Sequence, residues 1–167
     1  AVSDADTILN ITNHSYFNIG CGGQAAGDVL GAQVQIASAK YTPINEKRLP
    51  TGEICDVAGT AMDFREFHDI GSRIGEDDAN AQTVSGYDHN YILPGNPGEI
   101  CYAAAVRDPE SRRIVEVFTD MPGVQLYTAK ELVEQDGKGG ITYGNFGGLC
   151  FETQQDRKST RLNSSHE

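Results

Sequence analysis

Short runs of alternating apolar and polar residues, separated by turn-forming residues, constrain the fold of this chain most strongly. Ala32, Val34 and Ile36 alternate with Gln33 and Gln35. This period of two is typical of a strand with one buried face. Glycine occurs 19 times and proline 6 times, and both recur with Asn and Asp between the apolar runs. The pattern therefore predicts an all-β fold that is rich in turns.

Several other segments fit the same description. Asp108-Pro109-Glu110-Ser111 is a turn signal between two of them, which predicts a hairpin. Residues 129–134 contain no Gly or Pro and are predicted to form a short helical turn, whereas the glycine-rich residues 136–140 are predicted to be a loop. The predicted strands are residues 7–12, 91–93, 101–106, 113–119, 124–127 and 149–153.

Length and charge limit the function classes. The 167 residues suit one domain or part of a larger one. The net charge of −11 argues against nucleic acid and against an anionic membrane surface as partners. The sequence contains neither a run of apolar residues long enough to span a membrane nor a signal-peptide pattern. Because it starts at Ala1, we expect it to begin partway through a longer reading frame.

Cysteine spacing bears on metal binding and on the cellular compartment. No C-x-x-C pair is present, and the spacing between cysteines is wide. We therefore expect no metal site, and we expect reduced thiols in a cytoplasmic protein. The four cysteines are Cys21, Cys55, Cys101 and Cys150.

The end of the chain departs from the acidic character of the rest. Residues 156–166 read DRKSTRLNSSH, which is residue for residue the in-frame translation of a common sequencing adapter. Such segments are left out of fold arguments. We therefore expect one partial domain over residues 1–155 and a non-native tail over residues 156–167.

A histidine near the start of the chain lies among hydrogen-bonding side chains. The segment from Asn10 to Asn18 reads NITNHSYFN, with His14 at its centre. Imidazole titrates near neutral pH, which suits proton transfer. Its polar neighbours could orient the ring or bind a polyhydroxylated ligand. Taken alone, the pattern also fits a structural histidine.

Further polar segments occur at predicted strand ends, where a core does not need them. Together with the histidine segment and two loop motifs, they resemble the aldose 1-epimerase (galactose mutarotase) family in content and order. The resemblance covers nearly all of residues 5–155. The six segments are TNHSYFN from Thr12, LPTGE from Leu49, GTAMDFR from Gly59, GYDHNY from Gly86, PGVQLYT from Pro122 and CFETQ from Cys150.

The resemblance implies a general acid–base reaction on a small aldose sugar. His14 matches the family's general acid and Glu152 its general base. Such a reaction exchanges α and β anomers by opening and closing the sugar ring, with no metal or redox cofactor. The resemblance implies sugar-site residues at Ser15, Tyr16, Asp88 and Gln125.

The resemblance also implies the architecture. The family fold is a large β-supersandwich, and this chain resembles an internal part of it, truncated at both ends. The family's N-terminal half supplies a second histidine and an arginine that hold the sugar, and neither is present here. We therefore expect the polypeptide as written to be poorly soluble and to show little or no epimerase activity.

Two other functions remain open. One is a non-catalytic carbohydrate-binding β-sandwich, which needs no proton-transfer pair. The other is a hexose-phosphate epimerase, which needs a cluster of Arg or Lys for the phosphate. The absence of Trp weighs slightly against the first, and the lack of a basic cluster near the motifs weighs against the second. No pattern specifies an oligomeric state.

Structural interpretations of the same residues also remain open. Asp88 and His89 could form a hydrogen-bonded pair at a strand end. Glu152 could point to solvent, and Gln125 could be a surface strand residue. His68 and His89 are assigned no function. We expect Tyr16 and Phe17 to divide between the site wall and the core.

Overall fold

The computed structural model describes residues 2–20, 27–75, 85–96 and 98–155. The predicted non-native tail and Cys21 lie outside these residues. Strands dominate the described part, and all of the paired strands within it are antiparallel. The all-β prediction is therefore confirmed. No helix among the described residues is long and apolar enough to cross a membrane.

The first sheet has four strands in the order β4-β1-β6-β7. β1 (Gln33–Ile36) has the predicted alternation, with Val34 and Ile36 buried while the two glutamines are partly exposed. β6 pairs with β7 as the predicted hairpin, with a register shift between Tyr102 and Ala104. The other three strands are β4 (His68–Asp69), β6 (Cys101–Arg107) and β7 (Ile114–Thr119).

The second sheet has five strands in the order β11-β8-β5-β2-β3. It brings together strands that are far apart in the sequence, because β8 pairs with β5 on one side and with β11 on the other. The strands are β2 (Lys40–Thr42), β3 (Cys55–Asp56), β5 (Asp88–Ile92), β8 (Gly123–Tyr127) and β11 (Cys150–Gln154).

The smaller elements lie outside these two sheets. A separate hairpin is formed by β9 (Gln135–Asp136) and β10 (Thr142–Tyr143), and its tip is the 3-10 turn η3 (Lys138–Gly140). Gly139 takes a left-handed backbone conformation there, with φ of 71°, as a glycine-rich loop allows. A second 3-10 turn, η2 (Ile70–Ser72), follows β4.

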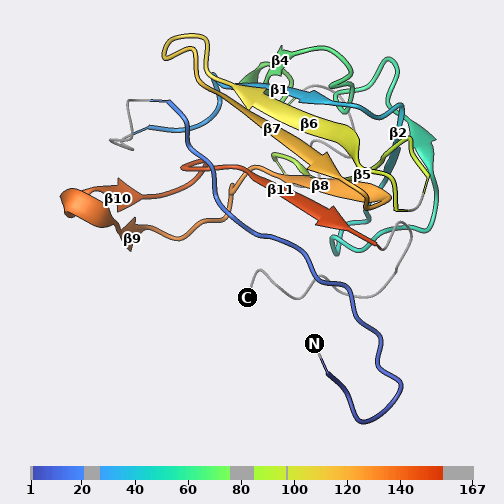
Figure 1. The fold of residues 1–167 in the computed structure, drawn as a ribbon. Coiled ribbons are helices and arrows are strands. Elements are labelled where there is room, and N and C mark those ends of the chain that lie inside the picture. Colours follow the sequence, from blue (N-terminus) through green and yellow to red (C-terminus); the bar gives the residue numbers. More distant parts are fainter. Residues whose placement is uncertain (1, 21–26, 76–84, 97, 156–167) are drawn as a thin grey trace.

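The two larger sheets form the layers of a sandwich around one core (Figure 1). Alternation along each strand sends one set of side chains inward. Val34 and Val106 from the first sheet belong to the same buried cluster as Tyr91, Leu126 and Phe151 from the second. The inner face of the five-stranded sheet therefore packs in the core, and its outer face can carry a functional site.

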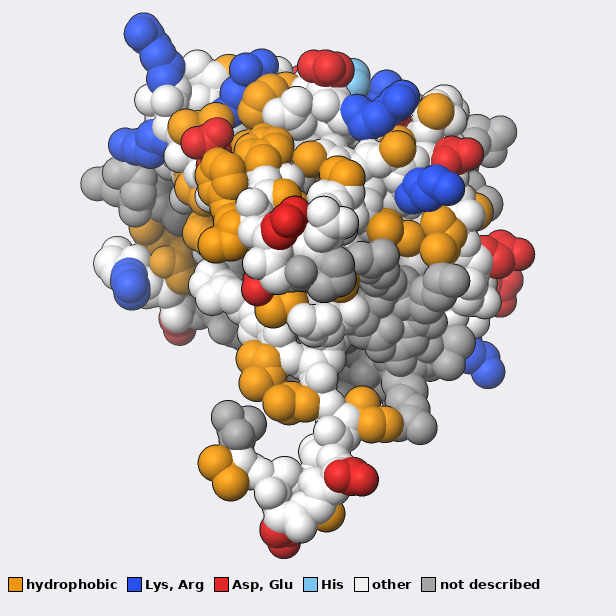
Figure 2. All heavy atoms as spheres, turned by 45° about the vertical axis from the view of Figure 1, so that its right-hand side comes forward, with side chains coloured by type: hydrophobic (Ala, Val, Ile, Leu, Met, Phe, Trp, Pro, Cys, Tyr) orange, Lys and Arg blue, Asp and Glu red, His pale blue; other side chains and the backbone are white. Residues whose placement is uncertain are grey.

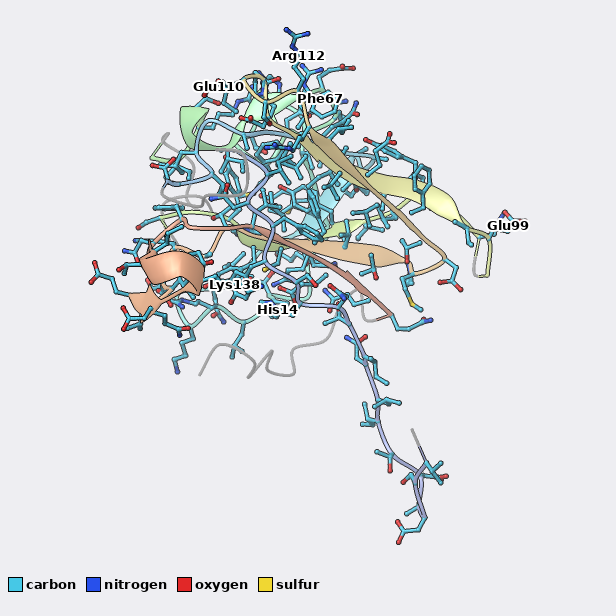
Figure 3. All side chains as sticks on the ribbon, turned by 60° about the vertical axis from the view of Figure 1, so that its left-hand side comes forward. His14, Phe67, Glu99, Glu110, Arg112 and Lys138 are labelled. Atoms are coloured by element: carbon cyan, nitrogen blue, oxygen red, sulfur yellow. The ribbon has the colours of Figure 1, made fainter. Side chains whose placement is uncertain are left out.

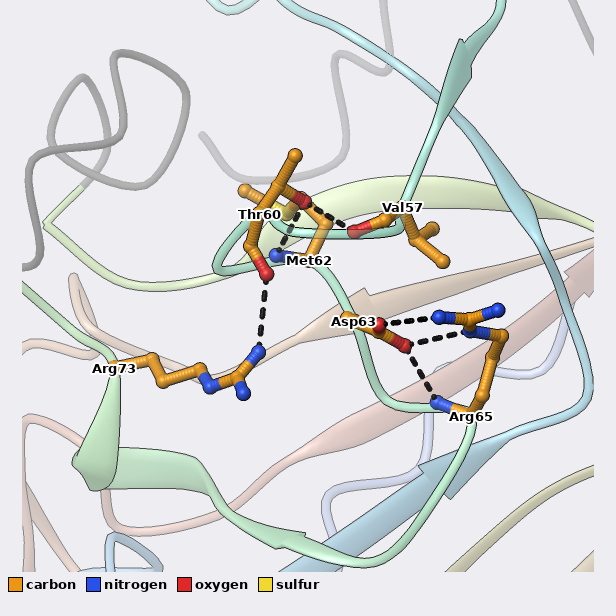
Figure 4. A network of polar contacts seen from close by, with 6 residues as sticks. All are labelled: Val57, Thr60, Met62, Asp63, Arg65 and Arg73. Carbon is orange, nitrogen blue, oxygen red and sulfur yellow. Dashed lines mark hydrogen bonds and ion pairs between the residues drawn. The ribbon is translucent and has the colours of Figure 1, made fainter.

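The GTAMDFR segment contributes to this core rather than to a polar site. Met62 and Phe64 are fully buried. The Thr60 hydroxyl donates to the Val57 carbonyl (2.8 Å) and accepts from the Met62 amide (3.1 Å), while Arg65 pairs with Asp63 (Figure 4). The segment is a turn whose polar residues stabilise its own backbone.

Two predicted elements are absent from the described structure. Residues 7–12 are extended but join no sheet, so the predicted strand is wrong. Ile8 and Ile11 are 78% and 64% exposed, because no strand pairs with this segment to bury them. Residues 129–134 form a turn and coil instead of a helical turn, with Ala129 in a left-handed conformation at φ 49°.

Candidate active site

The outer face of the five-stranded sheet carries a block of polar side chains in register. Glu152 of β11 pairs with Gln125 of β8, which pairs with Asn90 of β5. One step along the strands, Tyr127 lies between Cys150 and Asp88 in the same way. Residues two apart on a strand share a face. Strand register therefore places Glu152, Gln125 and Asn90 side by side, with Tyr127 and Asp88 in the next row of the same face.

This outer face is not a solvated face. Glu152 is 2% exposed, Asn90 6% and Gln125 7%. Buried polar groups normally need hydrogen-bonding partners or a function. The interpretations of Glu152 as solvent-facing and of Gln125 as a surface residue are therefore wrong.

His14 faces Glu152 from the segment that precedes the first sheet. Its Nε2 atom lies 3.4 Å from Glu152 Oε1. Figure 3 shows His14 on the side of the five-stranded sheet that faces away from the four-stranded sheet. Nearby, Phe17 forms an isolated bridge to Leu149, the residue before β11, with N–O distances of 2.7 and 2.9 Å. This bridge anchors the histidine segment beside the strand that carries Glu152.

The environment of Glu152 favours its protonated form. Burial raises the pKa of this carboxyl to about 7, and the negative charge of Asp88 adds to the rise. Its Oε1 atom accepts no hydrogen bond from the described residues. A carboxyl with a pKa near neutrality can exchange a proton efficiently at physiological pH.

A chain of amide side chains runs from Asn10 to Asp88. Asn10 Nδ2 donates to Gln154 Oε1 (3.2 Å), and Gln154 Nε2 donates to Gln125 Oε1 (3.2 Å) and to Asn90 Oδ1 (3.0 Å). Gln125 Nε2 then donates to Asp88 Oδ1 (2.7 Å). One branch of this chain ends at Asn90 and the other at Asp88, which accepts the last hydrogen bond. The second N–H of Gln125 makes no hydrogen bond to the described residues and can be offered to a ligand.

Aromatic rings form one wall around His14. The Tyr16 ring stacks on the imidazole at 5.2 Å between centroids, and the Tyr127 ring meets it edge-on at 6.0 Å. Tyr16 is 47% exposed, whereas Phe17 packs against the core. Phe17 therefore belongs to the core, as predicted, while Tyr16 lies beside His14 in the candidate site. Burial raises the pKa of Tyr127 to about 12, so its hydroxyl stays protonated.

Two further expectations concern the neighbours of these residues. The hydroxyl of Ser15 makes no hydrogen bond to the described residues, and its backbone N–H donates to Asn13 Oδ1 (2.9 Å). His89 is fully buried on the inner face beside Tyr41, and its Nδ1 accepts from the Asp88 amide (3.1 Å). The suggested Asp88–His89 pair is made by the backbone amide of Asp88, while the Asp88 carboxylate accepts from Gln125.

Sequence reasoning assigned no role to three residues that the structure brings into the site. Tyr127 touches the histidine, while Asn90 and Gln154 hold the amide chain. A signal was available, because Tyr127, Asn90 and Gln154 each lie two positions from a residue already singled out and so share its face of the sheet.

The described part of the chain contains no cluster of three or more side chains suited to holding a metal ion. Two carboxyls, Asp88 and Glu152, lie in the site, but the first is engaged by an amide and the second faces a histidine. The groups present can donate and accept protons and can hydrogen-bond a polar ligand.

Comparisons with known proteins identify the family of this chain. The sequence profile described as "Aldose 1-epimerase" matches residues 1–158. The chain belongs to the aldose 1-epimerase family. It is 39% identical over 155 residues to mouse galactose mutarotase, and 32% identical over 154 residues to aldose 1-epimerase of Escherichia coli K12. Each alignment covers 92% of this chain.

Solved structures of the aldose 1-epimerase family share the fold. The crystal structure of galactose 1-epimerase from Lactobacillus acidophilus matches with a TM-score of 0.71 and 30% identity, over 93% of this chain and 45% of that one. A Caenorhabditis elegans homologue matches in fold with a TM-score of 0.70. The chain spans 43% of the length of the mouse and E. coli relatives.

Proposed function

We propose that the whole protein is an aldose 1-epimerase that interconverts the α and β anomers of aldohexoses such as glucose and galactose. The contact between His14 Nε2 and Glu152 Oε1, at 3.4 Å on a buried polar face, carries the proposal. Membership of the family supports it. The sugar-contacting roles of Asp88, Gln125 and Tyr16 belong to the same proposal.

The reaction needs one base and one acid close together. Glu152 as carboxylate removes the proton from the C1 hydroxyl, and His14 as imidazolium protonates the ring oxygen. The bond between C1 and the ring oxygen breaks to give the aldehyde, the C1–C2 bond rotates, and the ring closes on the other face with both proton transfers reversed. Because the two oxygens share one carbon, adjacent acid and base groups suit this chemistry.

The remaining groups would orient the sugar. Asp88 can accept from a sugar hydroxyl, and the second N–H of Gln125 can donate to the adjacent hydroxyl, since the amide chain sets which of their atoms donate and which accept. The exposed Tyr16 ring offers an apolar surface beside the imidazole. We assign Ser15 no direct contact with the sugar, because its only hydrogen bond among the described residues is to Asn13.

The pH dependence of mutarotation tests this proposal. Glu152 must be ionised in the free enzyme to act as base, so kcat/KM for α-glucose should fall as the pH drops below about 7, the folded pKa of this carboxyl. Polarimetry on the whole protein between pH 5 and pH 8, corrected for spontaneous mutarotation, measures this limb. Sugar binding without any acceleration of anomer exchange would instead support the carbohydrate-binding alternative.

A further inference from the structure

A bidentate ion pair joins two loops that lie far apart in the sequence. The Arg48 guanidinium donates through Nη1 and Nη2 to the two carboxylate oxygens of Glu131. Both side chains remain nearly half exposed. This geometry occupies the planar donor face that arginine otherwise offers to a carboxylate or phosphate ligand. We refer to this pair as the Arg48–Glu131 clasp.

The loop before Pro50 holds Arg48 in place independently of the clasp. Arg48 has a left-handed backbone conformation with φ of 60°, which is uncommon for a residue with a side chain. Its amide donates to the Asn45 carbonyl (2.8 Å), while Asn45 Oδ1 accepts from the amides of Lys47 (2.9 Å) and Leu49 (3.1 Å). The turn therefore presents the guanidinium at a defined position.

The partner loop is equally fixed. Ala129 is fully buried with φ of 49°, and its carbonyl accepts from the amides of Leu132 (3.2 Å) and Phe146 (3.0 Å). Glu131 lies within this turn, and its backbone hydrogen-bonds the Tyr127 side chain. The two charged groups of the clasp thus meet between two constrained turns.

The clasp borders the candidate active site. Tyr127, which the Glu131 backbone contacts, places its ring against those of His14 and Tyr16. The hydrogen bond to Glu131 is the main cause that raises the pKa of Arg48, and the negative charge of Asp88 adds to the rise. Arg48 is therefore close enough to interact with the carboxylate to which we assign sugar binding.

We infer that the Arg48–Glu131 clasp makes the sugar site selective for uncharged aldoses. The Glu131 carboxylate pairs with the Arg48 guanidinium, which would otherwise bind the anionic group of a sugar phosphate or a uronate. This inference rests on the proposed function. With Arg48 paired to Glu131, its guanidinium no longer offsets the negative charge of Asp88, which disfavours anionic sugars. Removing the charge of Glu131 should free the guanidinium for an anionic substituent.

Calorimetric binding of glucose and glucose 6-phosphate to the whole protein tests the inference. In Glu131→Gln, the ratio of the phosphate Kd to the glucose Kd should fall by about tenfold relative to wild type, since a guanidinium–phosphate contact is charge-assisted and bidentate. The double variant Arg48→Gln/Glu131→Gln also lacks the guanidinium that the single change frees, and its ratio should return to the wild-type value. Glu134→Gln removes the same charge from the same loop and should leave the ratio unchanged.

An unchanged ratio in Glu131→Gln, or an equal fall in the double variant, would overturn the inference. Polarimetry on the same samples separates this outcome from failure of the proposed function. A wild-type protein that binds glucose without accelerating mutarotation contradicts the proposed function, yet the Kd ratios still decide the role of the clasp. Failure of every variant to bind either sugar would contradict both.

Discussion

Glu152 lies almost fully buried, opposite a histidine, on the outer face of the five-stranded sheet. Burial raises the pKa of this carboxyl to about 7, so between pH 4.5 and pH 7 the folded state binds more protons than the unfolded chain. The free energy of unfolding therefore falls as the pH rises through this window. The raised pKa that suits Glu152 to proton transfer near neutral pH thus lowers the free energy of unfolding at higher pH.

Replacing Glu152 with glutamine should remove this cost. We expect Glu152→Gln to unfold at a higher temperature than wild type at pH 8, by an equivalent of about 1–3 kcal/mol, with little difference at pH 4.5. Thermal unfolding of the whole protein at both pH values measures the effect. The exposed Glu134→Gln serves as the control and should follow wild type. Equal pH dependence in wild type and Glu152→Gln would contradict burial as the cause.

Gly123 tests the packing beneath the amide chain. A Cβ atom at this position would lie 2.7 Å from Asn90 Oδ1 and 3.3 Å from the Tyr91 carbonyl. Gly123→Ala should displace Asn90 from Gln154, destabilise the protein by about 1–3 kcal/mol and raise KM for the sugar. Gly31→Ala is the matched control, since nothing lies within 4 Å of its added methyl group. Urea unfolding and polarimetry that show no difference between the two variants would count against this packing.

At the scale of elements, the histidine segment is held to the sandwich at two places. Phe17 bridges Leu149, and Asn10 bonds both the Gln154 side chain and the Gln155 amide, at 3.2 and 3.0 Å. His14 lies between these anchors. Its approach to Glu152 therefore depends on contacts made several residues away on either side.

Asn10→Ala should loosen this segment and lower kcat several-fold while the Gln155 amide loses protection against hydrogen exchange. Asn10→Asp keeps the acceptor for the Gln155 amide but loses the donor to Gln154. It should therefore retain the protection and lose less activity. Hydrogen-exchange mass spectrometry and polarimetry on the whole protein make the comparison. Unchanged exchange in Asn10→Ala would show that this anchor does not hold the segment.

The sequence predicts the longer strands well and the shortest ones poorly. β1 follows from the period of two in its core residues, and β6 and β7 follow from the turn signal between them. β8 and β11 follow from their short runs of strand-forming residues. β3 and β4 have two residues each, which is too short to display a period. Residues 7–12 have the composition of a strand, yet strand formation also needs a partner edge, which local composition does not report.

The candidate site shows the same division. Alternation places Glu152 opposite Phe151, but it cannot tell a solvated outer face from a covered one, so the burial of Glu152 was not predictable from its neighbours. His14, Asp88, Gln125 and Glu152 were identified through their resemblance to a family. The structure brings them together through strand register and adds Tyr127, Asn90 and Gln154.

At the scale of the whole molecule, exposed apolar surface is the main feature that favours aggregation of this chain. Ile114 and Phe118 of the edge strand β7 are more than half exposed, as are Ile8 and Ile11 in the N-terminal segment. Figure 2 shows hydrophobic side chains gathered on one face of the molecule. Large apolar patches and free strand edges promote association.

We therefore expect the 167-residue polypeptide alone to aggregate and to show little mutarotase activity. Size-exclusion chromatography and polarimetry of the purified chain measure both properties. Phe118→Lys should raise the yield of soluble chain, because it removes an exposed apolar side chain. Glu116→Lys replaces a residue that is already polar and should leave the yield unchanged. A monodisperse and active wild-type polypeptide would contradict this expectation.

The central claim is that His14 and Glu152 act as an acid–base pair, and polarimetry of α-glucose mutarotation tests it most directly. In the whole protein, His14→Ala and Glu152→Gln should each lower kcat by about 10²-fold or more, because each removes a positioned proton-transfer group. Calorimetry should still detect sugar binding in both variants. A rate within about tenfold of wild type for either variant would contradict that residue's place in the pair.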